Sequence, residues 1–201
     1  GPIDSGPSII VDITDSDIAE VQRVAQTYGL DAGDYAVSGA DTTGEEYGVK
    51  IDWNITDGQR FSFRYGTSEQ SVAQFPDFFD DTISLDTHAY QRDYEFDTYT
   101  AQLFSDWTDN FSTEAKVSYR DYSAVRTPTS NTPEVEVQFG DNSILFGTEE
   151  NTHANILETE TVNAFFAGNL FVGDHTVKFG FDYEDNDIYN LFGRRTNGVY
   201  V

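Results

Sequence analysis

The chain has 201 residues and no cysteine, so it suits one domain or part of a larger one, without disulfides or thiolate metal sites. Its formal net charge of -25 repels phosphate backbones, and we expect no nucleic-acid partner. No run approaches the roughly 18 apolar residues of a transmembrane helix. The mean hydropathy of -0.50 does not exclude a membrane protein built from strands, in which only every second residue meets lipid.

Residues 1–44 are expected to be a loop region with one short helix. Ser16 is a candidate N-cap and Gly29 a candidate C′ residue. The apolar residues between them share one helical face: Ile18, Val21 and either Val24 or Ala25. No basic segment followed by an apolar one opens the chain, so no signal peptide is visible, and we expect a mature chain or a fragment.

From residue 45 the hydrophobic period becomes two, which indicates strands. Three times, two alternating strands flank a tight polar turn. The predicted hairpins are Tyr47–Ile55 with Arg60–Tyr65, Tyr94–Trp107 with Phe111–Tyr119, and Leu157–Val172 with His175–Tyr183. The turns contain Asp-Gly, Asp-Asn and Gly-Asp, which favour tight reversals.

Within the predicted strands, apolar residues alternate with polar or charged ones. In the first strand Val49 and Ile51 point one way, while Lys50 and Asp52 point the other. A strand face carrying several Lys, Arg and Glu residues cannot be buried in a dry core without unpaired charges. The pattern therefore predicts lipid on one side of the strands and water on the other.

The layout of the hairpins favours an all-β antiparallel transmembrane β-barrel. Residues 45–192 would form its hairpins, with long external loops at about 67–91 and 122–155, and 193–201 would start the next external loop. The second loop is expected to contain a small hairpin, Glu134–Phe139 with Ile144–Gly147. About six spanning strands are predicted, whereas bacterial single-chain barrels begin at about eight. We therefore expect a section of a larger barrel.

Several blocks carry a family resemblance, within the stretch 153–192 above all. Gly173–Glu184 has the pattern Gly-x-His-x-x-Lys-x-Gly-x-Asp-Tyr, and Asn186–Phe192 continues it. Lys50–Ile55 followed by Arg60–Tyr65 forms an earlier block. Together these blocks resemble TonB-dependent outer-membrane receptors, especially the Oar-like group. The resemblance implies a 22-stranded barrel, closed by a plug domain, that imports a scarce ligand with energy from TonB.

The sequence departs from that family pattern because it contains no TonB box, no plug domain and no terminal barrel strand, and no ligand residue of the family can be carried over. The resemblance implies the outer membrane of a Gram-negative bacterium as the location. The implied partners are outer-membrane lipid, the remainder of the same barrel with its plug, and the TonB complex through parts that this sequence does not contain.

Candidate sites are few. The aromatic residues Phe75, Phe78 and Phe79 in the first long loop are candidates for binding a ligand. His88, His153 and His175 lack the spacing of a metal motif, and no catalytic motif or cofactor-binding motif occurs, so we expect no enzyme, metal or cofactor. Glu158 and Glu160 lie on one strand face, where they are expected to form part of the lumen wall. Acidic runs such as Asp182–Asp187 offer oxygen ligands for calcium, although they do not match the spacing of an EF-hand loop.

Two other classes remain open. The first is a secreted acidic β-rich adhesin or surface-layer module, with calcium as its candidate stabiliser, and the weaker alternative is an extracellular carbohydrate-active enzyme. A barrel section depends on an amphiphile, whereas a soluble module refolds freely in water.

Overall fold

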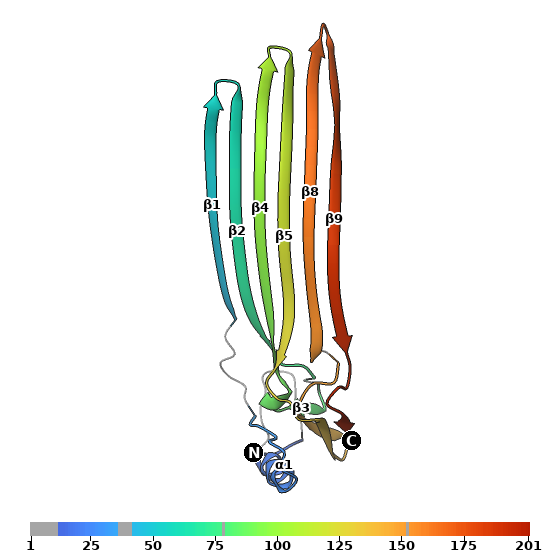
Figure 1. Cartoon of the computed structure of the whole chain (residues 1–201). Helices are drawn as coiled ribbons and strands as arrows, with labels where there is room; N and C mark the ends of the chain where they lie inside the picture. Colours follow the sequence, from blue (N-terminus) through green and yellow to red (C-terminus); the bar gives the residue numbers. More distant parts are fainter. Residues whose placement is uncertain (1–11, 36–41, 78, 152) are drawn as a thin grey trace.

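The computed structural model describes residues 12–35, 42–77, 79–151 and 153–201. This part of the chain forms a sheet of long strands with a smaller unit at one end (Figure 1). The long sheet has six strands in the order β1-β2-β4-β5-β8-β9, and all neighbouring pairs are antiparallel. Its strands are β1 (Thr43–Thr56), β2 (Gln59–Gln74), β4 (Tyr90–Thr108), β5 (Phe111–Pro128), β8 (Ala154–Val172) and β9 (His175–Gly193).

The prediction of an antiparallel β fold with one short helix is confirmed. The three predicted hairpins are β1–β2, β4–β5 and β8–β9, and each is a neighbouring pair in the sheet. β1 and β9 form its edges, and each pairs with one strand only among the described residues, so the sheet is open in this structure. Within the described residues, no helix combines the length and apolar content needed to cross a membrane.

The strands are longer than the sequence prediction allows. β2 continues to Gln74, β5 continues to Pro128 and β8 begins at Ala154, so the loops expected at about 67–91 and 122–155 are shorter. In β2 the alternation of apolar residues, on which the prediction rested, ends well before Gln74. Backbone pairing does not need apolar side chains, and the ladder continues through polar residues such as Ser71, which lies opposite Asp93.

The three hairpin turns lie together at the end of the sheet far from the smaller unit (Figure 1). In the first turn the Asp106 N–H donates a hydrogen bond of 2.7 Å to the carbonyl oxygen of Gly58. A Cβ atom on Gly58 would lie 2.7 Å from the carbonyl oxygen of Asp106. Glycine is therefore needed where this turn meets β4.

The remaining elements gather into one unit, which we call the cap. It comprises α1 (Asp15–Thr27), β3 (Thr82–Ser84), the 3-10 helix η1 (Asp86–His88), β6 (Glu134–Phe139), β7 (Asn142–Phe146) and β10 (Val199–Tyr200). The cap strands form a second sheet in the order β10-β6-β7-β3. The antiparallel pair β6–β7 confirms the small hairpin expected there. Residues 193–201, expected to begin a loop, end β9 and then place β10 beside β6 in a parallel pair.

The cap has its own apolar core, drawn from segments far apart in the sequence. Its buried members are Ile13, Ile18, Val21, Ala25, Ala32, Ile83, Leu85, Ile144 and Phe146. The long sheet has no comparable core, because many of its large apolar side chains are exposed. Hydrophobic burial therefore stabilises the cap, while backbone pairing and lateral contacts define the sheet.

Helix α1 has the expected position, with one correction. Its N-cap is Thr14 instead of Ser16: the Asp17 carboxylate accepts hydrogen bonds from the Thr14 N–H at 2.8 Å and from the Thr14 hydroxyl at 2.6 Å. An acidic side chain in the first turn also interacts favourably with the helix dipole. Gly29 has φ of +74° just after the helix, as its predicted C′ role requires.

Candidate functional site: the two faces of the long sheet

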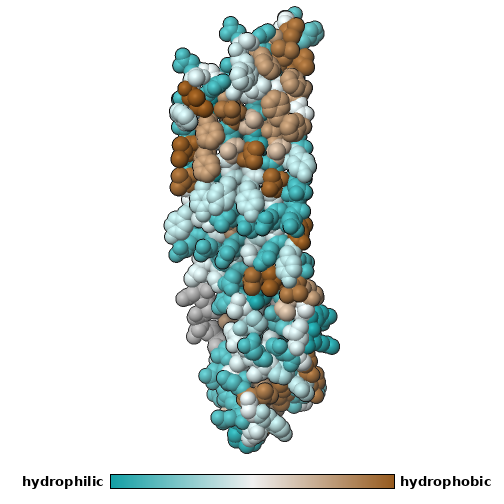
Figure 2. Space-filling view, in the orientation of Figure 1, coloured by the Kyte–Doolittle hydropathy of each residue, from teal (hydrophilic) through white to brown (hydrophobic). Residues whose placement is uncertain are grey.

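The register divides the side chains of the long sheet into two faces of different chemistry. We call the face that carries Val49 and Phe63 the apolar face, and the face that carries Lys50 and Arg64 the charged face. Residues directly opposite one another form rows across the six strands. Figure 2 shows hydrophobic side chains gathered on the part of the sheet nearer the hairpin turns, with hydrophilic ones across its middle.

Two continuous rows of the apolar face contain no charged residue. They are Trp53-Phe61-Leu103-Ala115-Phe166-Phe181 and Ile51-Phe63-Ala101-Val117-Ala164-Tyr183. Ile51 and Val117 are each 55% exposed, and Phe181 is 61% exposed. An exposed apolar surface of this extent, uncovered by any other described element, is typical of a surface that contacts a membrane or another protein.

The next row on the same face is rich in tyrosine. It reads Val49-Tyr65-Tyr99-Tyr119-Val162-Asp185. The rings of Tyr65 and Tyr99 have centroids 4.9 Å apart, and those of Tyr99 and Tyr119 are 6.2 Å apart. The Tyr65 hydroxyl donates a hydrogen bond of 3.0 Å to Asp97 in the following row. The tyrosines therefore join apolar side chains on one side to acidic ones on the other.

Beyond the tyrosine row the apolar face becomes acidic. We call the following two rows the acidic rows: Tyr47-Thr67-Asp97-Asp121-Glu160-Asp187 and Glu45-Glu69-Glu95-Ser123-Glu158-Tyr189. A shallow groove of about 290 Å³ lies among Glu95, Asp97, Asp121 and Glu158. Within the described part of the chain no cluster of His, Asp or Glu is arranged to hold a metal ion.

The charged face carries every Lys and Arg residue of the six long strands. These are Lys50, Arg60, Arg64, Arg92, Lys116, Arg120, Arg126 and Lys178. Several have local partners: Arg120 forms an ion pair with Glu184 at 3.4 Å, and Arg60 lies 4.7 Å from the ring centre of Phe104. Because no strand lysine or arginine lies on the opposite face, the sheet separates charge across its thickness.

The charged face has a depression near the cap, with a volume of about 500 Å³. It is lined by residues of β2, β4 and β5, among them Arg92 and the aromatic residues Tyr94, Phe96 and Tyr122. Burial lowers the pKa of Arg92, but the neighbouring Tyr94 and Tyr90 have the opposite effect, so that its pKa is raised overall. Arg92 is therefore positively charged at neutral pH.

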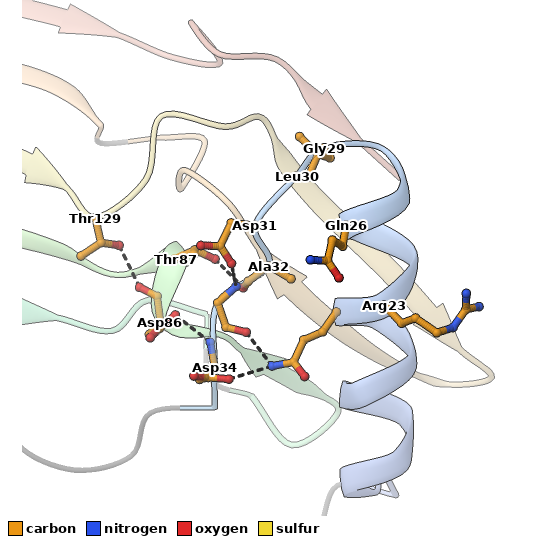
Figure 3. A pocket seen from close by; sticks show the side chains of 12 residues that line it. Arg23, Gln26, Gly29, Leu30, Asp31, Ala32, Asp34, Asp86, Thr87 and Thr129 are labelled. Atoms are coloured by element: carbon orange, nitrogen blue, oxygen red, sulfur yellow. Dashed lines mark hydrogen bonds between the residues drawn. The ribbon is translucent and has the colours of Figure 1, made fainter.

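A second, larger depression of about 1060 Å³ lies beside α1 (Figure 3). Its polar groups mostly bond to one another: Gln22 Nε2 donates to the Gly33 carbonyl at 2.8 Å, and the Asp34 N–H donates to Asp86 Oδ1 at 2.9 Å. The Thr87 hydroxyl donates to the Ala32 carbonyl at 2.7 Å. These hydrogen bonds connect α1 and the segment after it to η1. We call this connection the joint, and its bonds indicate a structural role for the depression.

Other buried polar groups also serve the structure of the cap. His88 is fully buried, with Nδ1 donating to the Gly147 carbonyl at 3.0 Å and Nε2 at 3.1 Å from the Asp77 carboxylate. Burial raises the pKa of Glu134, whose carboxylate accepts a hydrogen bond of 2.6 Å from the Glu150 N–H. The paired Arg195 lowers the pKa of Glu150.

The candidate site residues have mixed outcomes. Phe75 and Phe79 are exposed, at 42% and 58%, and neither lines the depression on the charged face. Phe78 lies outside the described residues. A ligand role for these aromatic residues stays a prediction.

The acidic candidates need correction. Glu158 and Glu160 were expected on the polar wall, but alternation along β8 puts them on the same face as Val162, in the acidic rows. The acidic run Asp182–Asp187 belongs to β9, so its side chains are divided between the two faces of the sheet.

Sequence reasoning missed the pair Arg92 and Arg126, which lie directly opposite each other on β4 and β5. Arg126 falls in the stretch that was interpreted as loop. The period of two does continue there, through Tyr122, Ala124 and Arg126, and is the signal that could have extended β5.

Fold and site together define an antiparallel β-sheet protein whose long open sheet has one apolar and acidic face and one charged face. Comparison with protein-family models, curated proteins and solved structures finds no match for this chain.

Proposed function

We propose that the six long strands are a section of the barrel wall of an outer-membrane TonB-dependent receptor of the Oar-like kind, with the cap on the outer side. In this proposal the apolar face meets lipid and the charged face lines an aqueous lumen. The edge strands β1 and β9 pair with further strands of the same barrel, since an open edge in lipid would leave backbone groups unpaired.

The observation that carries this proposal is the order of rows along the apolar face. Trp107 lies near the turns, and Tyr99 lies eight residues away in the same strand, with the apolar rows between them. Eight residues correspond to about 27 Å along a strand, or about 20 Å across a membrane at a tilt of about 40°. Membrane barrels have an apolar band about 25 Å tall between two aromatic girdles.

The lengths of the strands fit the same arrangement. A membrane-crossing strand needs about 9–11 residues, whereas β4, β8 and β9 each have 19. The part of each strand beyond the tyrosine row carries the acidic rows and leads to the cap. It would project into water on the outer side, where the cap and the charged face could receive a ligand.

The proposal is tested by placing one positive charge on each face at the same depth. Leu103 lies midway between Trp107 and Tyr99 on the apolar face, and its neighbour Gln102 lies on the charged face. An arginine on the lipid face near mid-membrane costs about 2–4 kcal/mol. We expect Leu103→Arg to reduce partition into zwitterionic vesicles by about 30-fold or more, with Gln102→Arg close to the parent chain.

Partition is measured for the full chain, diluted from detergent, by the fluorescence of Trp53 and Trp107 and its quenching by brominated lipid. Equal partition of the two variants would contradict the lipid placement. A parent chain that stays monomeric and folded in water without amphiphile would instead favour the secreted acidic module.

A further inference from the structure

Arg92 and Arg126 form an unneutralised pair on the charged face. They are direct neighbours across β4 and β5, at a separation where like charges destabilise a sheet. Within the described residues neither arginine forms an ion pair, and the Nε atom of each is buried without a hydrogen-bond partner. A buried donor left unpaired destabilises the fold, and more so when it is charged.

No carboxylate of the long sheet is close enough in register to balance this charge. The adjacent rows of the charged face contain only uncharged residues: Gln70-Tyr94-Ala124-Leu157-Asn190 on one side and Gln74-Tyr90-Pro128 on the other. Asp93 is next to Arg92 in sequence, but it lies on the opposite face and accepts hydrogen bonds from Ser71 at 2.6 Å and Thr127 at 3.2 Å. The counter-charge is missing from the sheet itself.

Arg92 lines the 500 Å³ depression described above, and Arg126 lies directly opposite Arg92 in the register of β4 and β5. Its aromatic lining (Tyr94, Phe96 and Tyr122) offers ring faces and edges, and Gln70 and Gln74 offer amide groups. Ligand pockets usually have volumes of about 300–1,000 Å³ and combine apolar walls with a few convergent polar groups. A planar guanidinium binds carboxylate and phosphate oxygens in a bidentate manner.

We propose that Arg92 and Arg126 bind a small dianionic ligand, a phosphate monoester or a dicarboxylate, whose ring or sugar packs against Tyr94, Phe96 and Tyr122. The ligand supplies the two negative charges that the sheet lacks. The site rests on the proposed function in one respect, because ligand access requires that the charged face meets water and not a packed core. The inference goes beyond the proposed function because it names the chemistry of the ligand.

Phenyl phosphate is the probe, with phenol and inorganic phosphate as its separate halves. Binding to the full chain in detergent micelles is measured by calorimetry. We expect phenyl phosphate to bind more tightly than inorganic phosphate, and phenol not to bind. Arg92→Gln and Arg126→Gln should each weaken binding by about tenfold or more, since a hydrogen bond to a charged group contributes about 1.5–3 kcal/mol.

Arg120→Gln is the matched control, because Arg120 lies on the same face of β5 as Arg126 but is already paired with Glu184. It should change binding less than twofold. Without ligand, Arg126→Gln should raise the melting temperature, because it removes a like-charge contact. A residue with a merely structural role would lower that temperature.

Three results would overturn the inference: no binding of phenyl phosphate by the parent chain at millimolar concentration, unchanged binding in both glutamine variants, or equal weakening by Arg120→Gln. If the glutamine variants do not melt cooperatively, Arg92→Lys, which keeps the charge but loses the planar fork, takes their place and should still weaken binding. Failure of the proposed function is distinguished from failure of this inference by the vesicle partition of Leu103→Arg and Gln102→Arg, which is measured without phenyl phosphate.

Discussion

Gly33 shows at the scale of one residue how the cap is joined together. Its φ is +74°, and a Cβ atom there would overlap the Asp86 carboxylate and lie 2.7 Å from Thr87 Cγ2. Both groups hold the joint, since Asp86 accepts from the Asp34 N–H and Thr87 donates to the Ala32 carbonyl (Figure 3). Gly29 has the same φ but nothing within 4 Å of its Cβ position.

The two glycines therefore separate backbone strain from steric conflict. A left-handed conformation costs an alanine about 1–2 kcal/mol, so Gly29→Ala should lower the melting temperature by about 2–8 °C. Gly33→Ala adds the loss of about two hydrogen bonds and should lower it about twice as far. Thermal melting followed by circular dichroism measures both. Equal shifts in melting temperature would mean that the hydrogen bonds around Gly33 do not contribute to the stability of the cap.

Residue patterns alone predicted some of the local features. Gly29 ends α1 as expected, because a C′ glycine depends only on neighbouring residues. Arg92 and Arg126 escaped prediction as a pair, because their proximity depends on the register of two strands, of which β4 was predicted to begin too late and β5 to end too early. Ser16 was predicted as the N-cap, but the helix begins earlier, with Thr14 as the N-cap and hydrogen bonds from Thr14 to Asp17.

At the scale of the element, each long strand has two halves. The half nearer the turns alternates between apolar and polar residues, and this half was predictable from the sequence. The half nearer the cap carries more polar residues. In β2 and β5 it was largely interpreted as loop, whereas the predicted strands Tyr94–Trp107 and Leu157–Val172 already included most of it in β4 and β8. Residues Val49, Ile51 and Val117 are exposed and are not sealed between two packed sheets, as a soluble sandwich would require.

The open edges lead to a prediction about backbone protection. Every strand from β2 to β8 in the long sheet pairs on both sides, whereas β1 and β9 pair on one side only. In micelles containing the full chain, the outward amides of β1 and β9 should exchange about 100-fold faster than those of β4 and β5. Hydrogen exchange read by mass spectrometry measures this difference. Equal protection would show that the edges are covered, by each other or by a second copy, and would contradict open edges.

At the scale of the whole molecule, the segments between hairpins converge on the cap. Its core contains Ile13 from before α1, Ile83 from the segment after β2 and Ile144 from the segment after β5. The small hairpin with Ile144 was predicted from local residues, but its burial together with Ile13 and Ile83 was not. Their joint burial depends on the hairpins that carry them to the same end of the sheet, and a local reading of the sequence does not contain that information.

Charge is also organised across the whole molecule. The face that would meet lipid carries ten carboxylates along the long strands and no Lys or Arg. These carboxylates are Glu45, Glu69, Asp93, Glu95, Asp97, Asp121, Glu158, Glu160, Asp185 and Asp187. Most of them follow directly after the tyrosine row, where lipid head groups would lie. Anionic head groups should therefore repel the inserted chain within a Debye length of about 8–10 Å.

This repulsion predicts how insertion depends on lipid charge. At low ionic strength the chain should partition more weakly into vesicles with anionic lipid than into zwitterionic ones, and added salt should remove the difference. Glu95→Gln removes one charge from the acidic rows, and a charge near a membrane surface contributes about 1 kcal/mol. Partition into anionic vesicles should therefore rise about fivefold.

Glu46→Gln, on the charged face of β1, is the matched control and should have little effect because its carboxylate faces away from lipid. If both substitutions change partition equally, net charge alone governs insertion, and the acidic rows do not lie at the head groups.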